Sequence, residues 1–355
     1  MDAVDLFDNS LSDRQKSQTI EYFAEIFGGL KENTFLAYDS DLLIYRQFCK
    51  DRNVLMVSTD PQVAYETVRD YLKFLFEKGN NKYTIQRRLN TVSLLFKVTE
   101  TYNPIAENAN FAAIRKNMMA NLSGQQKQAT PVDGSILAII NEHFVPEKLV
   151  DVRDQAMVNC MFDGLLRSSE TINMEFGDIN EVDNNVLLPE SKSDKEKRGT
   201  TRFLSDTSIA MVQEWKSLSG IELEPDGPIW RQMTPKGESL LENSQSVIKK
   251  AQEQDKERAP LVISRISHYR AIKRLLEKAL KDSGQSTSGF SSHSMRVGAA
   301  VEMAKHGIST NVIARTGGWK SETMVLRYIR GLDARDSGTA IIAKKMNRWS
   351  KARPS

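Results

Sequence analysis

The sequence predicts a mainly α-helical protein of two domains: a helical N-terminal domain, and a second, mostly helical domain that also contains a small antiparallel sheet. Apolar residues recur at helical spacing through most of the chain, and only two short segments have the composition of strands. A polar segment that ends in proline, residues 123–131, divides the chain. Two domains are also expected for 355 residues, because one compact core rarely covers that length.

The N-terminal domain, residues 1–122, is predicted to be helical from about Asn33 to Asn121. Gly79-Asn80-Asn81 interrupts the pattern after the second helix, the third begins near Thr84, and the fourth runs from about Phe111. The apolar faces of the first two helices consist of Tyr38, Leu42, Leu43, Tyr45 and Phe48, and then of Val68, Tyr71, Leu72, Leu75 and Phe76. Basic residues outnumber acidic ones between Lys82 and Gln128, which indicates either a DNA-facing segment or a solvated helix face.

The segment 123–131 is predicted to be a linker or hinge, and the second domain to span residues 132–355. Its two strand candidates, 185–189 and 200–204, flank a hydrophilic run and indicate a hairpin. Helices are expected at about 133–142, 150–166, 206–217, 264–281, 294–306, 310–315, 322–330 and 338–349, with a short one entered at 167–170. Gly307 and Gly317 stand where helix C-terminal glycines belong, and Ser309 and Ser321 where N-caps belong.

The composition is that of an ordinary globular protein, with 40% apolar and 27% charged residues. No apolar run is long enough to cross a bilayer, and the acidic N-terminus lacks the order of a signal peptide, so we expect an intracellular protein. Cys49 and Cys160 lack metal-ligand spacing, and we expect packed thiols with neither a disulfide nor a metal. A net charge of +3 is too small by itself to indicate nucleic-acid binding.

The residues that indicate chemistry lie near the end of the chain: His293-Ser-Met-Arg296, Gly317-Gly318-Trp319 and Tyr328. An arginine fork binds two phosphate oxygens at once, imidazole and indole N–H groups donate to the same oxygens, and a phenol is a nucleophile that needs no metal. His293 and Arg296 project from one face of a helix start. An isolated pair of this kind is usually an ordinary surface pair, so only the combination indicates phosphoryl transfer onto tyrosine.

Three further positions would complete such a site. Arg167 supplies a second guanidinium, and Glu170, one turn later, could orient it, although alone they would be an ordinary helix ion pair. A lysine in the hairpin turn could protonate a departing 5′-oxygen; spacing from the strand favours Lys192, with Lys195 and Lys197 as alternatives in a solvated charge run. A phenol with a pKa of about 10 is mostly protonated at neutral pH. Its attack therefore requires neighbouring cations that favour the phenolate, or a base that takes the proton.

His293-Ser-Met-Arg-Val-Gly-Ala-Ala300, Gly-Gly-Trp319 and Arg-Tyr328-Ile-Arg-Gly-Leu-Asp333 resemble the tyrosine site-specific recombinases of the phage integrase superfamily, in particular their Cre-like branch. Leu165-Leu-Arg167-Ser-Ser-Glu170 is similar to the first arginine box of that family, and Asp282-Ser-Gly284 also resembles the Cre-like branch. Trp319 stands where many other branches have a second histidine. The resemblance extends from about Asn33 to the C-terminus and is strongest after residue 160.

The resemblance implies the tyrosine recombinase fold, a C-shaped clamp in which a core-binding domain and a catalytic domain hold double-stranded DNA. Tyr328 would attack the scissile phosphate to give a 3′-phosphotyrosine and a free 5′-hydroxyl, and strands would be exchanged through a Holliday junction. A homo-tetramer would join two DNA sites, each with inverted half-sites around a short spacer. In this scheme the phosphate is bound by Arg167, Arg296, His293 and Trp319, while Lys192 is the general acid and Glu170 orients the site.

The resemblance also implies no cofactor, no metal, no small-molecule substrate and no membrane, and a cytoplasmic, plasmid- or phage-encoded protein of bacteria. The expected last helix, 338–349, would dock into a neighbouring protomer through the apolar stripe Ile341, Ile342, Met346 and Trp349, with packing on its own domain as the alternative. Helical spacing also suggests two DNA-reading surfaces. One consists of Lys82, Gln86, Arg87 and Arg88, and the other of Arg265, His268 and Arg270. Arg115 and Lys116 are expected to contact DNA phosphates.

Three alternatives remain. A phage-type integrase or chromosome-resolving recombinase would share the chemistry but use accessory domains or partners. A type IB topoisomerase-like relaxase would form the same phosphotyrosine and rejoin the same strand. In a non-catalytic helical DNA-binding regulator, the presence of these polar residues in this order would be a coincidence. The order and intervals of Arg167, His293, Arg296, Trp319 and Tyr328 favour the recombinase.

Overall fold

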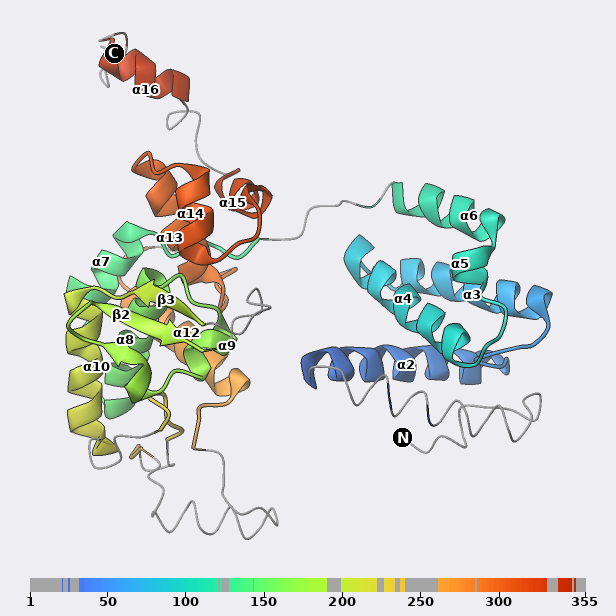
Figure 1. Ribbon diagram of the computed structural model, residues 1–355, viewed down its shortest axis with the longest axis horizontal. Helices are drawn as coiled ribbons and strands as arrows, with labels where there is room; N and C mark the ends of the chain where they lie inside the picture. The colour runs from blue at the N-terminus through green and yellow to red at the C-terminus, as the bar shows by residue number, and fades with distance from the viewer. Residues whose placement is uncertain are drawn as a thin grey trace. The chain divides into compact units, whose positions relative to one another are not determined.

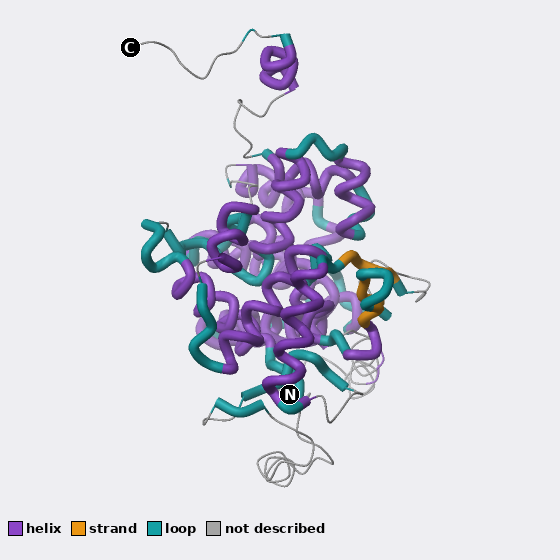
Figure 2. Tube along the Cα trace, turned by 90° about the vertical axis from the view of Figure 1, so that its left-hand side faces the viewer, coloured by secondary structure: helices purple, strands orange, loops and turns teal. Residues whose placement is uncertain are grey.

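The computed structural model describes residues 32–120, 128–142, 144–189, 199–221, 227–233, 237–239, 261–284, 286–330 and 338–346, together with residues 21, 25, 122 and 348. The chain folds into two compact units, Met1–Lys127 and Gln128–Ser355 (Figure 1). Both units are mainly helical, and the described strands form a single three-stranded sheet in the second unit. The described residues form mainly helices and one small sheet, and this arrangement confirms the predicted fold class (Figure 2).

The first unit packs its helices around a core that includes three aromatic rings. Its elements are α2 (Glu32–Arg52), α3 (Pro61–Glu77), α4 (Lys82–Val98), α5 (Pro104–Glu107) and α6 (Ala109–Ala120). The ring of Tyr71 lies 4.8 Å from that of Tyr45 and 5.1 Å from that of Phe48, between centroids. Most of the predicted apolar positions are buried, but Leu43 is 47% exposed and lies outside this core.

The helix boundaries of this unit follow local capping chemistry. The Asp60 side chain accepts from the backbone N–H groups of Gln62 and Val63 at the start of α3, and Asn81 accepts from Thr84 N–H at the start of α4. Gly79 between them has φ of +68°, a left-handed conformation that glycine adopts without strain. The interruption predicted at residues 79–81 is therefore where the chain turns from α3 into α4.

The second unit is built around α8 (Leu149–Asp163), most of which is buried. The other helices of this unit are α7 (Gly134–Glu142), α9 (Ser168–Ile172), the 3₁₀ helix η2 (Phe176–Asp178), α10 (Asp206–Ser219), α12 (Arg265–Ala279), α13 (Ser294–Lys305), α14 (Thr310–Gly317), α15 (Glu322–Ile329) and α16 (Gly338–Lys345). Helices α10, α12 and α13 contact α8. Two apolar clusters result: a large one that contains Met157, Trp215 and Leu276, and a smaller one that joins Leu165 to Val325.

The sheet has the antiparallel order β1-β2-β3, formed by β1 (Ile179–Asn180), β2 (Asn185–Leu188) and β3 (Thr200–Phe203). The predicted hairpin is confirmed, with Val186 opposite Arg202 in its register. Strand β1 was not predicted, because two residues are too few to show alternation. The hairpin turn, residues 190–198, lies outside the described residues, and so do Lys192, Lys195 and Lys197.

The helix ends near the predicted site agree with the sequence in all but one case. Gly307 follows α13 with φ of +77°, and the Ser309 hydroxyl accepts from Val312 N–H, as expected for a C-terminal glycine and an N-cap. Ser321 occupies the N-cap position of α15 without a side-chain hydrogen bond. The prediction for Gly317 is wrong: it is the last residue of α14, and Gly318, with φ of +62°, is the left-handed cap.

Hydrogen bonds join the first residues of the second unit to α13 and α15, the helices that carry Arg296 and Tyr328. Val132 N–H donates to the Ser294 carbonyl over 3.0 Å, and a Cβ on Gly298 would lie 1.7 Å from the Val132 oxygen. Only glycine permits this close approach of α13 to the chain. Four residues before Val132, Gln128 Nε2 donates to the backbone carbonyl of Tyr328 over 3.0 Å.

Cys49 and Cys160 are buried free thiols in different units, as predicted. None of the helices in the described part of the chain has the length and apolarity to span a bilayer.

Candidate active site

Arg167 is held at the start of α9 by Glu170. The Glu170 Oε2 atom accepts from the backbone N–H of Arg167 over 2.8 Å, and its Oε1 pairs with Arg167 Nη1. The second fork nitrogen, Nη2, reaches the Gly318 carbonyl at 3.4 Å. Glu170 is buried, so its carboxylate orients the guanidinium from inside the protein while Arg167 remains partly accessible.

Arg296 lies on α13 and is 2% exposed. Its two terminal nitrogens donate to the carbonyls of Leu165 and Gly317. Leu165 has φ of +48°, a left-handed conformation that is uncommon for leucine and costs on the order of 1 kcal/mol. Burial, and then the charge of Arg167, lower the pKa of Arg296 to about 9, so its guanidinium is still a cation at neutral pH.

Trp319 joins Arg296 to the candidate nucleophile. The guanidinium carbon of Arg296 lies 4.1 Å from the centroid of the Trp319 ring, a cation–π contact. The rings of Trp319 and Tyr328 are 5.4 Å apart between centroids and tilted by 53°. Tyr328 is half-buried on α15, and its phenol is within electrostatic reach of Arg296.

His293 precedes α13 and exposes its ring. Desolvation by surrounding protein atoms, and then the positive charges of Arg296 and Arg167, hold the pKa of His293 below its ordinary value of 6.5. The imidazole is therefore neutral at pH 7, with one N–H donor and one free lone pair. Arg167, Glu170, His293, Arg296, Trp319 and Tyr328 are thus brought together in the second unit.

Arg202 is a charged residue close to Glu170 and Arg167 that was not predicted from the sequence. Arg202 lies on β3, is 7% exposed, and is within electrostatic reach of Glu170 and Arg167. Strand alternation puts it on the same side as Leu204, which is buried. That alternation was the available signal, since an arginine on the inner side of a strand requires an acidic partner or a function.

The predicted DNA-reading face of α4 is divided by the structure. Lys82 is exposed and Gln86 is half-buried, whereas Arg87 and Arg88 pair with the buried carboxylate of Asp41, at 2.7 Å and 3.5 Å. The Arg88 side chain is only 16% exposed. Grouping Arg88 with Lys82 on one outer face is therefore wrong, because Arg88 lies one and two turns before Val92 and Leu95 of the core. Arg115 and Lys116 are at least partly exposed on α6.

The second predicted reading surface, on α12, needs one correction. Arg265 and Arg270 are exposed, but His268 is 1% exposed and belongs to the core side of the helix. Neither ring nitrogen of His268 has a hydrogen-bond partner among the described residues. Burial, and then the charge of Arg153, lower its pKa to about 4, so His268 is an uncharged interior residue.

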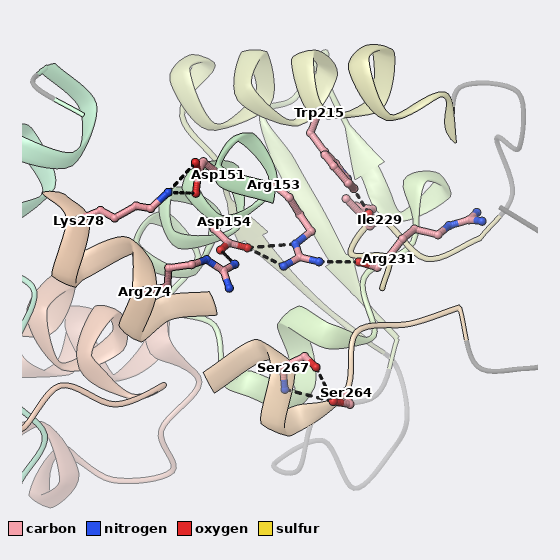
Figure 3. A network of polar contacts seen from close by, with 10 residues as sticks. All are labelled: Asp151, Arg153, Asp154, Trp215, Ile229, Arg231, Ser264, Ser267, Arg274 and Lys278. Carbon is pink, nitrogen blue, oxygen red and sulfur yellow. Dashed lines mark hydrogen bonds and ion pairs between the residues drawn. The ribbon is translucent and has the colours of Figure 1, made fainter. Parts of the chain in front are cut away.

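A charge network built on the buried carboxylates of Asp151 and Asp154 joins α12 to α8 (Figure 3). Lys278 Nζ pairs with Asp151 at 2.8 Å, and Arg274 pairs with Asp154, which also binds Arg153. Arg153 Nη1 in turn donates to the Arg231 carbonyl over 2.8 Å. Removal of one basic member would leave a buried carboxylate with less compensation, so the network stabilises the packing of α12 on α8, with Arg265 and Arg270 exposed.

The arrangement can bind a phosphodiester and attack it. Two guanidinium groups, an imidazole, an indole and a phenol converge, and the cations stabilise both a phosphate and a phenolate. Within the described residues, His, Cys, Asp and Glu side chains form no group of three or more that could hold a metal ion.

Comparisons with known proteins agree with this chemistry. A model of the phage integrase family matches residues 135–335. The recombinase Cre of Escherichia phage P1 is 26% identical over 332 residues, covering 92% of this chain and 92% of that protein. An integrase/recombinase XerD homolog of Selenomonas ruminantium is 26% identical over 309 residues, covering 84% of this chain and 81% of the relative. A solved Tn1549 transposon integrase, in complex with transposon right end DNA, shares the fold with a TM-score of 0.59 at 13% identity over 93% of this chain and 98% of its own.

Proposed function

Because the chain belongs to the phage integrase family, whose members are tyrosine recombinases that cleave and rejoin DNA, we propose that Tyr328 is the nucleophile of a site-specific DNA recombinase. The observation that carries the proposal is the contact of the Trp319 ring with both the Arg296 guanidinium and the Tyr328 ring, beside the Gly318 carbonyl that accepts from Arg167. Arg296, which lies within electrostatic reach of both Arg167 and the Tyr328 phenol, joins the two parts of the site.

Phosphate binding is the first step of the proposed mechanism. Arg167 and Arg296 neutralise the phosphodiester, and the neutral His293 and the Trp319 indole donate further hydrogen bonds. Each arginine now donates to protein acceptors, Arg167 to Glu170 and Gly318, and Arg296 to Leu165 and Gly317. These acceptors hold the forks beside the tyrosine before DNA arrives, which lowers the cost of ordering them.

Strand cleavage follows by in-line displacement. The Tyr328 phenol gives up its proton to solvent water as its oxygen forms a bond to phosphorus, the bond from phosphorus to the 5′-oxygen breaks, and a 3′-phosphotyrosine remains. Lys192 gives its proton to the departing 5′-oxygen, and Glu170 keeps Arg167 in place. The bond energy stays in the phosphotyrosine, so a 5′-hydroxyl from a partner duplex can attack it without ATP.

The remaining parts of the proposal rest on the resemblance to the tyrosine recombinases described above. Residues 1–122 would be the core-binding domain, 123–131 the linker and 132–355 the catalytic domain, and the two domains would clamp one half-site of an inverted repeat. Four protomers would exchange strands through a Holliday junction. Trp319 supports placing the chain in the Cre-like branch, and relatives from a phage and a bacterium support action in the bacterial cytoplasm on plasmid or phage DNA.

The test is covalent trapping on a nicked suicide substrate that carries the target half-sites, identified by footprinting DNA beside the gene. The wild type should accumulate a protein–DNA adduct that survives denaturation. Tyr328→Phe should form none while binding the same DNA, because the ring is kept and only the nucleophilic oxygen is lost. An adduct that persists in Tyr328→Phe would exclude this tyrosine.

A further inference from the structure

Residues 128–133, here called the strap, lead into α7 and lie along the chain around the start of α13. Thr130 N–H donates to the Gly289 carbonyl over 3.0 Å, and the Thr130 hydroxyl donates to the next carbonyl before it over 3.1 Å. Two residues later, Val132 N–H donates to the Ser294 carbonyl over 3.0 Å. The strap is therefore bound to the chain both before and after the histidine of the candidate site.

Two glycines allow the strap to approach this closely. A Cβ on Gly289 would lie 2.4 Å from Thr130 Oγ1, and a Cβ on Gly298 would lie 1.7 Å from the Val132 oxygen. Val132 is itself fully buried in the core of the second unit. The strap is therefore a fixed part of this unit, and Gln128 lies only two residues before its first backbone anchor.

Gln128 contacts the backbone of the proposed nucleophile. Its Nε2 donates to the Tyr328 carbonyl over 3.0 Å. Tyr328 is the penultimate residue of α15, and the last carbonyls of a helix lack partners within the helix. Gln128 thus supplies a donor at the helix end where the backbone requires one from outside.

The ring and the backbone of Tyr328 are held by different parts of the fold. Trp319 contacts the ring, at 5.4 Å between centroids, and the strap contacts the carbonyl. Helix α15 has only eight residues, so a shift of its end moves the phenol directly. A misplacement of about 1 Å can cost on the order of 100-fold in rate when a nucleophile must attack in line.

We propose that Gln128 is a positioning residue for Tyr328: its side-chain amide holds the end of α15 so that the phenol stays in line with the scissile phosphate. This inference rests on the proposed function and deepens it. The amide acts through the tyrosine backbone and takes no part in making or breaking bonds. Because the strap is anchored at Thr130 and Val132, the amide is already placed before DNA binds, which lowers the entropic cost of ordering the site.

The experiment measures the rate of adduct formation on the suicide substrate at saturating DNA, together with DNA affinity and thermal melting. Gln128→Met keeps the length of the side chain but lacks the N–H donor. It should cleave about 3- to 10-fold more slowly, the effect of one hydrogen bond, with affinity changed less than about twofold because the loss is confined to the reacting complex. Gln128→Lys, whose ammonium group can donate to the same carbonyl, should recover at least about half of the wild-type rate.

Gln232→Met is the matched control. Gln232 Nε2 also donates to a backbone carbonyl over 3.0 Å, that of Val262, in the same unit but away from the residues of the candidate site. This variant should cleave within about twofold of the wild-type rate.

A wild-type rate in Gln128→Met, an equally slow Gln128→Lys, or an equal slowing in Gln232→Met would overturn the inference. A loss of DNA affinity with an unchanged rate at saturation would place Gln128 on the DNA and would overturn it as well. Absence of any wild-type adduct would instead overturn the proposed function.

Discussion

At the scale of single residues, the site depends on a tight contact between a glycine and a tryptophan. A Cβ on Gly317 would lie 2.1 Å from the Trp319 ring, and the Gly317 carbonyl is also an acceptor of Arg296. The same ring lies under the Arg296 guanidinium and beside the Tyr328 ring. The backbone at Gly317 therefore helps to position three of the groups proposed to act on the phosphate: Arg296, Trp319 and Tyr328.

Gly317→Ala should displace Trp319 and lower the rate of adduct formation. The added methyl group cannot be accommodated without moving the ring, and overpacking of this kind costs about 1–3 kcal/mol, which outweighs the gain in helix propensity of about 1 kcal/mol. Gly177→Ala, which meets no atom within 4 Å, is the control and should change stability by less than about 0.5 kcal/mol. Thermal melting and the cleavage rate measure both effects, and an unchanged rate in Gly317→Ala would contradict the role of Trp319.

Arg88 and Lys82, both on α4, should respond differently to substitution. Arg88→Met removes one of two cations from the buried Asp41, whose pKa is already raised by burial, and should destabilise the N-terminal unit by roughly 2 kcal/mol. Lys82→Ala should leave the free energy of unfolding unchanged. If Lys82 contacts a DNA phosphate, the substitution should also reduce the slope of log binding constant against log salt concentration by about one. Urea unfolding and binding across a salt series separate the two. A stable Arg88→Met with a reduced salt slope would place Arg88 on the DNA instead.

At the scale of elements, the same amphipathic rule explains what was predicted and what was missed. The catalytic motifs are local in sequence, so the pattern of residues alone was enough to select His293, Arg296, Trp319 and Tyr328. Burial depends on neighbouring helices. His268 precedes Ile272 by four residues and Leu275 by seven, so its spacing already placed it on the inner face of α12.

His268 should make the protein less stable in mild acid. Its folded pKa of about 4 is below the unfolded value of 6.5, so the unfolded chain binds the proton first as the pH falls. Between pH 7 and pH 5 protonation of this residue in the unfolded chain should remove about 2 kcal/mol of stability; the loss begins near pH 6.5 and grows as the pH falls toward the folded pKa. His268→Phe, compared by urea unfolding at both pH values, should show a correspondingly smaller loss. The exposed His306→Asn is the control, and equal pH dependence in wild type and His268→Phe would refute the assignment.

Long-range geometry explains the remaining differences from the sequence. Alternation along β3 marked Arg202 as an inward-facing residue, but its electrostatic relation to Glu170 and Arg167 depends on the folded chain. The pairs of Asp41 with α4 likewise join segments distant in sequence, whereas β1 pairs with the neighbouring β2 and was missed because it has only two residues. The turn with Lys192 lies outside the described residues, so the general acid stays a prediction.

At the scale of the whole molecule, the proposed function needs several protomers on DNA. The last helix, α16, is shorter than the predicted 338–349, and Trp349 lies outside the described residues. Ile341, Ile342 and Met346 are 40%, 56% and 60% exposed. These apolar side chains remain available for another protomer, as the prediction of an exchanged helix requires.

Deletion of the residues after Gly338 should spare binding to a single site and abolish synapsis. Within the full chain, Ile342→Asp should weaken synapsis because it buries a charge at the contact, whereas Lys345→Gln on the same helix should have little effect. Gel shifts on one site and tethering of two sites measure the two activities. Full recombination by the truncated protein would refute the exchange.

The most direct measurement is the identity of the residue joined to DNA. Arg327 and Arg330 bracket the nucleophile, so trypsin and nuclease treatment of the trapped complex should release Tyr328-Ile329-Arg330 carrying the nucleotide remnant. Mass spectrometry of that tripeptide is the result expected here. Nucleotide found instead on a peptide that lacks Tyr328, such as one containing the exposed Tyr269, would contradict the proposed mechanism.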